Sequence, residues 1–174
     1  MRPARQVMWQ TECMREWSDF TLLDGLTVRL VAGPCGLSAI DFRGEPVHDA
    51  WHNDRNELIL EAGRQLRAYF DGKLRVFELP LEMLGTPFQL RVWRELERIP
   101  YGETRSYLQV AAAIGAEKAV RAVGAANGAN PIPIVVLCHR VIGAGGKLVG
   151  YGGGLPLKKR LLALEGTLAG DLGL

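Results

Sequence analysis

The segment from Asn130 to Gly143 constrains this chain most, because an apolar run ends there in a cluster of reactive side chains. It reads NPIPIVVLCHRVIG. The residues from Ile134 to Leu137 are all apolar, which predicts a short buried strand. The run ends at Cys138, and a histidine, an arginine and then glycine-rich sequence follow it. A thiol between a rigid buried strand and a glycine-rich loop is a candidate nucleophile, since the strand fixes its position and the mobile loop leaves it accessible to a substrate.

Cys138 has a second interpretation as a structural cysteine of the core, since free cysteine is among the most buried residue types. The neighbouring His139 does not decide between the two interpretations. Successive side chains of a strand point to opposite faces, so contact between Cys138 and His139 would require a turn or a bridging water. Both interpretations therefore stay open, and for a lone cysteine the structural one is the more common.

The same segment resembles the active-site signature of the O6-alkylguanine-DNA alkyltransferases, which is typically Pro-Cys-His-Arg-Val after a strand that Asn-Pro opens. The resemblance extends without a gap from about Gly85 to Gly166, and it continues more weakly through the N-terminal half. Leu137 is the one departure in the signature, because the family has proline there. Proline fixes φ and lacks an N–H, so leucine loosens the backbone beside the nucleophile and adds a donor.

Length and composition limit the class of protein. A chain of 174 residues, 48% of them hydrophobic, can bury a core as one domain or as two small ones. Its apolar runs are far shorter than a membrane span, and polar residues interrupt the N-terminal stretch, so we expect neither a transmembrane segment nor a signal peptide. The three cysteines are widely spaced, which argues against a disulfide framework and favours a reducing cytoplasm.

Charge is distributed unevenly along the chain. The part up to Leu84 carries 10 basic and 13 acidic residues, and the part from Gly85 onward carries 11 and 6. The second part is therefore the candidate for an anionic partner, of which nucleic acid is the usual one. The signal is mild, because imbalances of this size also occur on ordinary solvated surfaces.

Residues 1–84 predict a small α+β domain with a β-hairpin. Two alternating runs, Leu26–Val31 and Leu37–Phe42, flank the turn sequence GPCG. Apolar residues at helical spacing predict a helix from Asn56 to Phe70, which an Asp-Gly pair ends.

We expect neither a metal site nor a cofactor. The cysteines and histidines of the N-terminal domain are the right residue types for a metal site, but they lack the close Cys-x-x-Cys type spacing of a zinc site. These residues are Cys13, Cys35, His48 and His52.

Residues 85–174 predict a mostly helical domain. Capping boxes that begin at Thr86 and Ser106 predict the starts of two helices. A further helix from about Glu117 to Asn127 follows the second of these, and the pair predicts a helix-turn-helix. Small residues dominate the further helix. They would allow close approach to a phosphate backbone, and equally tight packing against another helix.

The glycine-rich region after the cysteine leads into the last predicted elements. Lys147 to Tyr151 predict a strand. Pro156 at the first helical position predicts the start of a last helix, Leu157 to Glu165, which closes at Gly166. Glu165 lies in the last turn, where the helix dipole disfavours a carboxylate. It is therefore either a solvated end residue or a carboxylate held to polarise a histidine.

The resemblance implies a division of labour at the site. Cys138 accepts the alkyl group, His139 takes the thiol proton through a water, and Glu165 orients and polarises His139. Asn130 braces the active-site turn, and Tyr107 donates a proton to guanine N3 while its ring crowds the phosphate of the flipped nucleotide. Such a relay is chemically consistent, because the thiolate is the nucleophile and an ordinary cysteine is mostly protonated at neutral pH.

The resemblance also implies how the substrate is bound. Double-stranded DNA carrying O6-alkylguanine, or O4-alkylthymine, binds through its minor groove, and the damaged base leaves the stack to reach the thiol. The implied protein is a cytoplasmic monomer without a cofactor, and it reacts once because a thioether does not hydrolyse. In this picture Arg121 fills the gap left by the base, Gly124 lies against the groove, and the base pocket is lined by Val141, Tyr151 and Gly152.

Two other classes of protein fit parts of the sequence. A DNA-binding protein that senses alkylguanine without repairing it would share the helix pair, but such relatives lack the acceptor cysteine that this chain has at Cys138. A cysteine hydrolase would use Cys138 and His139, but it would need an oxyanion hole and an acyl-enzyme that water regenerates. No glutamine or second histidine is evidently placed for that chemistry, so DNA repair by alkyl transfer is the function we expect.

Overall fold

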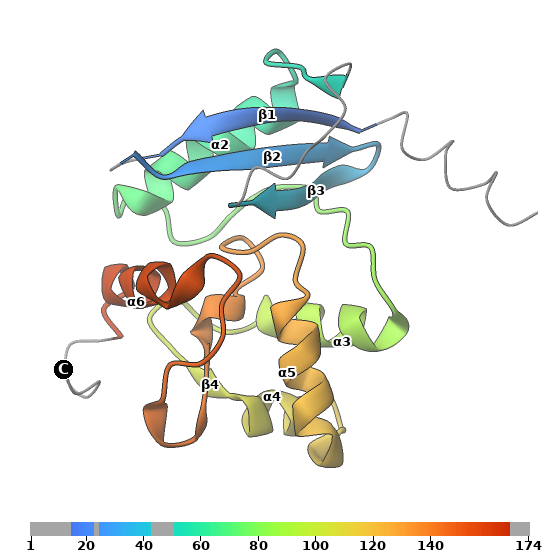
Figure 1. Cartoon of the computed structure of the whole chain (residues 1–174), viewed down its shortest axis with the longest axis vertical. Helices are drawn as coiled ribbons and strands as arrows, with labels where there is room; N and C mark the ends of the chain where they lie inside the picture. Colours follow the sequence, from blue (N-terminus) through green and yellow to red (C-terminus); the bar gives the residue numbers. More distant parts are fainter. Residues whose placement is uncertain (1–14, 23–24, 43–50, 168–174) are drawn as a thin grey trace, which may run out of the picture. The chain divides into compact units, whose positions relative to one another are not determined.

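The computed structural model describes residues 15–22, 25–42 and 51–167. The chain divides into two compact units, Met1–Glu82 and Met83–Leu174. The boundary predicted from the sequence, between residues 84 and 85, lies close to this division. The predicted α+β class is confirmed, with the three-stranded sheet in the first unit and a mostly helical second unit (Figure 1).

The first unit is a three-stranded antiparallel sheet with a helix packed against it. The strands are β1 (Glu16–Thr21), β2 (Thr27–Gly33) and β3 (Gly36–Asp41), in that order, and the helix is α2 (Glu57–Phe70), which the Asn56 side chain caps. The predicted hairpin and helix are confirmed, and β1 is a strand that the sequence analysis did not predict. The core between sheet and helix is built from fully buried side chains: Val28, Leu30, Leu37, Ile59, Ala62, Leu66 and Tyr69.

The second unit contains four α-helices in its described part: α3 (Pro87–Leu96), α4 (Tyr107–Ala113), α5 (Val120–Gly128) and α6 (Gly154–Leu164). Both predicted capping boxes are present, at the starts of α3 and α4. The predicted helix pair corresponds to α4 and α5 (Figure 1), and a 3₁₀ turn, η3 (Glu117–Ala119), precedes α5.

Two contacts fix α5 and α4 around the cysteine segment. The buried Trp93 of α3 donates its indole N–H to the carbonyl of Ala126 in α5, at 2.8 Å. A short parallel pair, β4 (Arg105–Ser106) with β5 (Val141–Ile142), joins the start of α4 to the residues just after the cysteine. The first residue of α4, Tyr107, is therefore held near the reactive segment although it lies far from it in sequence.

The segment before Cys138 is a buried turn, so the predicted strand from Ile134 to Leu137 is wrong. The amide of Asn130 closes the turn, donating from Nδ2 to the carbonyl of Val136 at 2.8 Å and accepting from the N–H of Ile132 at 3.0 Å. Ile134 has a positive φ of 75°, which no regular strand contains. Apolar composition correctly predicted burial, but the side-chain hydrogen bonds of Asn130 replaced a strand ladder.

Two further predictions after the cysteine are also wrong. Lys147 to Tyr151 do not form a strand, because the Lys158 ammonium binds carbonyl groups of this stretch that a partner strand would otherwise bind. The last helix, α6, begins at Gly154 rather than near Leu157. Pro156 is thus the third residue of the helix, where its missing N–H still costs no helical hydrogen bond.

Leu137, where the family has proline, already has a backbone that proline can adopt. Its φ is −76°, within the range that the proline ring allows, and no hydrogen bond uses its N–H in the described part of the chain. We therefore predict that Leu137→Pro raises the free energy of unfolding by roughly 0.4–1 kcal/mol, through a more restricted unfolded chain. Thermal melting measures this, and a lower melting temperature would show that the turn needs the leucine.

Candidate active site

Cys138 opens a short 3₁₀ helix, η4 (Cys138–Arg140), and only 4% of its surface is exposed. Hydrogen bonds hold this turn at both ends: the Cys138 N–H donates to Val136 at 2.7 Å, and the Arg140 N–H donates to Leu137 at 3.0 Å. Contact between Cys138 and His139 was expected to require a turn or a bridging water, and the two residues do lie in a turn and not in a strand.

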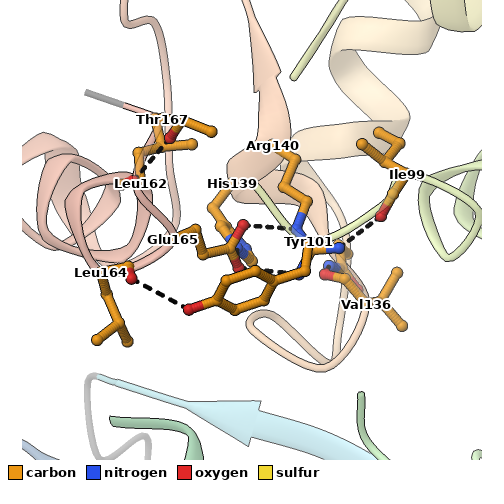
Figure 2. A network of polar contacts seen from close by, with 10 residues as sticks. Ile99, Tyr101, Val136, His139, Arg140, Leu162, Leu164, Glu165 and Thr167 are labelled. Atoms are coloured by element: carbon orange, nitrogen blue, oxygen red, sulfur yellow. Dashed lines mark hydrogen bonds and ion pairs between the residues drawn. The ribbon is translucent and has the colours of Figure 1, made fainter. Parts of the chain in front are cut away.

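Both residues after the cysteine converge on one carboxylate, as Figure 2 shows. His139 Nε2 lies 3.0 Å from Glu165 Oε1. The Arg140 guanidinium binds the same carboxylate in a bidentate manner, with Nε 2.8 Å from Oε2 and Nη2 2.9 Å from Oε1. All three side chains are at least nine-tenths buried. Glu165 is therefore the centre of a buried network and not a solvated helix end.

The network explains why a carboxylate is tolerated at the end of α6, where the helix dipole is unfavourable. Arg140 brings a full positive charge to that position, and its guanidinium also donates to the carbonyl of Ile99. The Tyr101 ring centroid lies 5.7 Å from the same guanidinium, and the Tyr101 hydroxyl donates to the Leu164 carbonyl at 3.0 Å. These contacts fix the last turn of α6, and with it Glu165, against η4 (Figure 2).

The Cys138 thiol is protonated at neutral pH in this environment. Burial raises its pKa to about 11, although hydrogen bonding by Asn130 and the charge of Lys158 act in the opposite direction. A buried thiol of this kind becomes a nucleophile only if a nearby base takes its proton during the reaction.

His139 can be that base. Burial lowers the pKa of His139, outweighing the hydrogen bond and charge of Glu165 that act to raise it. The imidazole is consequently neutral at pH 7 and able to accept a proton, and the adjacent carboxylate stabilises the cation once it forms.

Lys158 is a buried residue of the site that the sequence analysis missed. Its ammonium is fully buried and donates to the carbonyls of Val141 at 2.6 Å, Val149 at 2.9 Å and Gly150 at 3.5 Å. Burial lowers its pKa to about 8, so it remains charged at pH 7. The sequence did contain a signal for this residue, because Lys158 shares a helix face with Leu161 and other buried residues. An apolar face seldom carries a charge without a partner.

The other predicted site residues lie on α4, α5, β5 and the loop before α6. Tyr107 is half-buried and begins α4, and its ring lies 3.8 Å from where a side chain on Gly124 would begin. Arg121 is exposed one turn earlier on α5. The pocket residues differ in exposure: Val141 is buried directly after η4, Tyr151 is half-buried, and Gly152 is exposed.

Among residues 15–22, 25–42 and 51–167, no group of three or more metal-ligating side chains is assembled. Cys13 and His48, two of the four residues considered for zinc, lie outside these ranges. Cys35 and Cys138 are both free thiols. The same part of the chain has no helix long and apolar enough to cross a membrane.

Comparison with known proteins agrees with this geometry. The family model described as "6-O-methylguanine DNA methyltransferase, DNA binding domain" matches residues 87–167. A methylated-DNA–protein-cysteine methyltransferase of Mycolicibacterium paratuberculosis is 56% identical over 129 residues, which are 74% of this chain and 78% of the relative. The chain belongs to the methylated-DNA–protein-cysteine methyltransferase family.

Solved structures extend the similarity over both units. The crystal structure of Mycobacterium tuberculosis O6-methylguanine methyltransferase matches with a TM-score of 0.78 and 44% identity. The match covers 91% of the present chain and 98% of the Mycobacterium tuberculosis chain. A structure of Mycobacterium tuberculosis OGT in complex with DNA matches with a TM-score of 0.74 and 47% identity, over 87% and 91% of the two chains. The family, the fold class and the methyltransferase activity predicted from the signature are confirmed.

Removal of the Glu165 charge should destabilise this methyltransferase strongly. Glu165→Gln leaves the Arg140 guanidinium buried without its charged partner, and breaking a buried ion pair from one side costs about 3–5 kcal/mol. Denaturant unfolding should therefore show a much lower midpoint, and alkyl transfer should slow because His139 loses its carboxylate.

Glu61→Gln is the matched control for this substitution. Glu61 pairs with Arg64 at 2.6 Å on the surface of α2, where an ion pair contributes little. Equal, small shifts of the unfolding midpoint for the two variants would mean that the buried network is not what fixes η4 to α6.

Proposed function

We propose that this methyltransferase repairs O6-alkylguanine in double-stranded DNA by moving the alkyl group irreversibly to Cys138. The observation that carries the proposal is the buried relay behind the cysteine: His139 directly follows Cys138 in a tight turn, and its imidazole contacts Glu165 at 3.0 Å. A structural core cysteine would need no such arrangement. O4-alkylthymine, which presents a similar alkoxy carbon beside a ring nitrogen, is a second substrate in this proposal.

The transfer begins with the thiol proton. His139 is neutral and takes this proton through a water, and Glu165 and Arg140 hold the imidazole in place as it becomes charged. The thiolate of Cys138 then attacks the alkyl carbon, an S–C bond forms, and the C–O6 bond breaks. Tyr107 gives a proton to N3 of the departing guanine. Because the thioether does not hydrolyse, each molecule reacts once.

Extrusion of the base is required, because a thiol this deeply buried cannot reach a base stacked inside a duplex. The exposed surface of α5 carries Arg121 among small residues, Ala122 and Ala125, which suits close approach to the floor of a minor groove. Arg121 fills the gap that the base leaves, with Gly124 beside it. The similarity to OGT in complex with DNA supports DNA as the partner.

The extruded base enters a pocket lined by Val141, Tyr151 and Gly152. Lys158 fixes two sides of this pocket at once, because it binds the carbonyl of Val141 and those of the loop that leads to Tyr151. Minor-groove contacts read little sequence, which is appropriate for repair at any guanine. The protein would act as a monomer in the cytoplasm, where its free thiols remain reduced.

Mass spectrometry tests the central step. After incubation with a duplex containing O6-methylguanine, the protein should gain one methyl group per chain, on Cys138, and the duplex should contain normal guanine. Cys138→Ala should abolish transfer and retain most of the DNA binding. Methylation of Cys35 instead, or several turnovers per molecule, would contradict the proposal.

Arg121→Ala separates base extrusion from chemistry. Because only the duplex requires extrusion, this substitution should slow repair of O6-methylguanine in duplex DNA on the order of tenfold or more, and leave reaction with free O6-benzylguanine nearly unchanged. Lys118→Ala, on the preceding 3₁₀ turn, is the control for loss of a positive charge near α5. Equal losses of rate on both substrates would assign Arg121 a structural role.

A further inference from the structure

Asn127, near the end of α5, is a buried polar residue beside the Cys138 turn. Only 4% of its surface is exposed. Its Nδ2 donates to the carbonyl of Cys138 at 3.4 Å, and its Oδ1 has no hydrogen-bond partner within the described part of the chain. The Cys138 carbonyl takes one of the two N–H donors of this amide, which leaves the second N–H for another partner beside the nucleophile.

Tyr107 packs against α5 one helical turn before Asn127. Gly124 is one helical turn before Asn127 on the same face of α5, and the Tyr107 ring is packed beside that glycine. Burial raises the pKa of Tyr107, as does a negative charge on Cys138, whereas hydrogen bonding by Asn127 lowers it. The amide that binds the Cys138 carbonyl thus also interacts with the phenol of Tyr107.

We propose that Asn127 is a positioning residue for alkyl transfer, holding the Tyr107 hydroxyl beside the Cys138 turn and stabilising it as it loses its proton. This inference rests on the proposed function, in which Tyr107 protonates guanine N3. Asn127 contacts neither the alkyl group nor the sulfur in this account, and it acts through Tyr107.

The proton balance shows when such help is required. The Cys138 thiol passes its proton to His139, and the thiolate displaces guanine from the alkyl carbon. The guanine anion takes the hydroxyl proton of Tyr107, which leaves a phenolate in a half-buried site. The phenolate later regains a proton from His139 through water, so the sum is thiol plus alkylguanine giving thioether plus guanine. Asn127 acts while the phenolate exists.

An asparagine has the chemistry that this position needs. Its amide carries two N–H donors, so one can bind the Cys138 carbonyl while the other binds the phenolate oxygen. Hydrogen bonds to a charged partner are roughly twice as strong as neutral ones, so the amide favours the phenolate over the phenol. A leucine of similar size could not donate, and an aspartate would repel the phenolate.

A double-mutant cycle tests the inference. Single-turnover alkyl transfer from O6-methylguanine in duplex DNA is measured for the wild type, Asn127→Leu, Tyr107→Phe and the double variant. A hydrogen bond to a charged group corresponds to a rate change on the order of 10- to 100-fold, which we expect for Asn127→Leu when Tyr107 is present. In the Tyr107→Phe background the same substitution should change the rate less than about twofold, because no hydroxyl remains to be stabilised.

Equal losses of rate on the two backgrounds would overturn the inference and assign Asn127 a structural role at the Cys138 carbonyl. If Asn127→Leu does not fold, Asn127→Asp provides the same cycle at nearly unchanged size, with the same dependence on Tyr107 expected. Gln65→Leu removes a buried amide from the first unit, where it binds the backbone of Glu78, and it should lower the melting temperature without changing transfer. Absence of methyl transfer to Cys138 in the wild type would instead refute the proposed function itself.

Discussion

The second unit depends on one buried carboxylate. Glu165 accepts hydrogen bonds from two consecutive residues of the cysteine turn, and thereby joins η4 to the last turn of α6. A buried carboxylate without partners would be costly, so the network holds only if the turn is closed and α6 has its full length. The bonds that would position His139 for the proposed chemistry are therefore also bonds that hold the fold together.

Burial gives this site its chemical character. It keeps the thiol of Cys138 protonated and His139 neutral in the resting protein. In the proposed reaction, the nucleophile forms only when a proton moves to the imidazole, so the resting thiol is protected from other electrophiles. Tyr107 is the other group that loses a proton, and Asn127 would stabilise it in that state. Each proton donor of the proposed reaction thus has a buried polar partner: His139 for Cys138 and Asn127 for Tyr107.

Local sequence signals predicted most helices and the hairpin well. The capping boxes at Thr86 and Ser106 depend on residues three positions apart, which the sequence shows directly. The turn before Cys138 could not be predicted in this way, because an amide from Asn130 replaces the hydrogen bonds of a strand. Lys158 was missed for a similar reason, since its carbonyl partners come from two segments that only the fold brings together.

In the proposed reaction, His139 is a neutral proton acceptor that Glu165 holds in place. Titration of the ¹⁵N-labelled imidazole by NMR measures this directly in the resting protein. We expect His139 to be neutral at pH 7 and to titrate below the ordinary histidine value of about 6.5, because burial disfavours the cation. An imidazolium at pH 7, with a pKa above the ordinary histidine value of about 6.5, would contradict the account, since His139 could not then take the thiol proton.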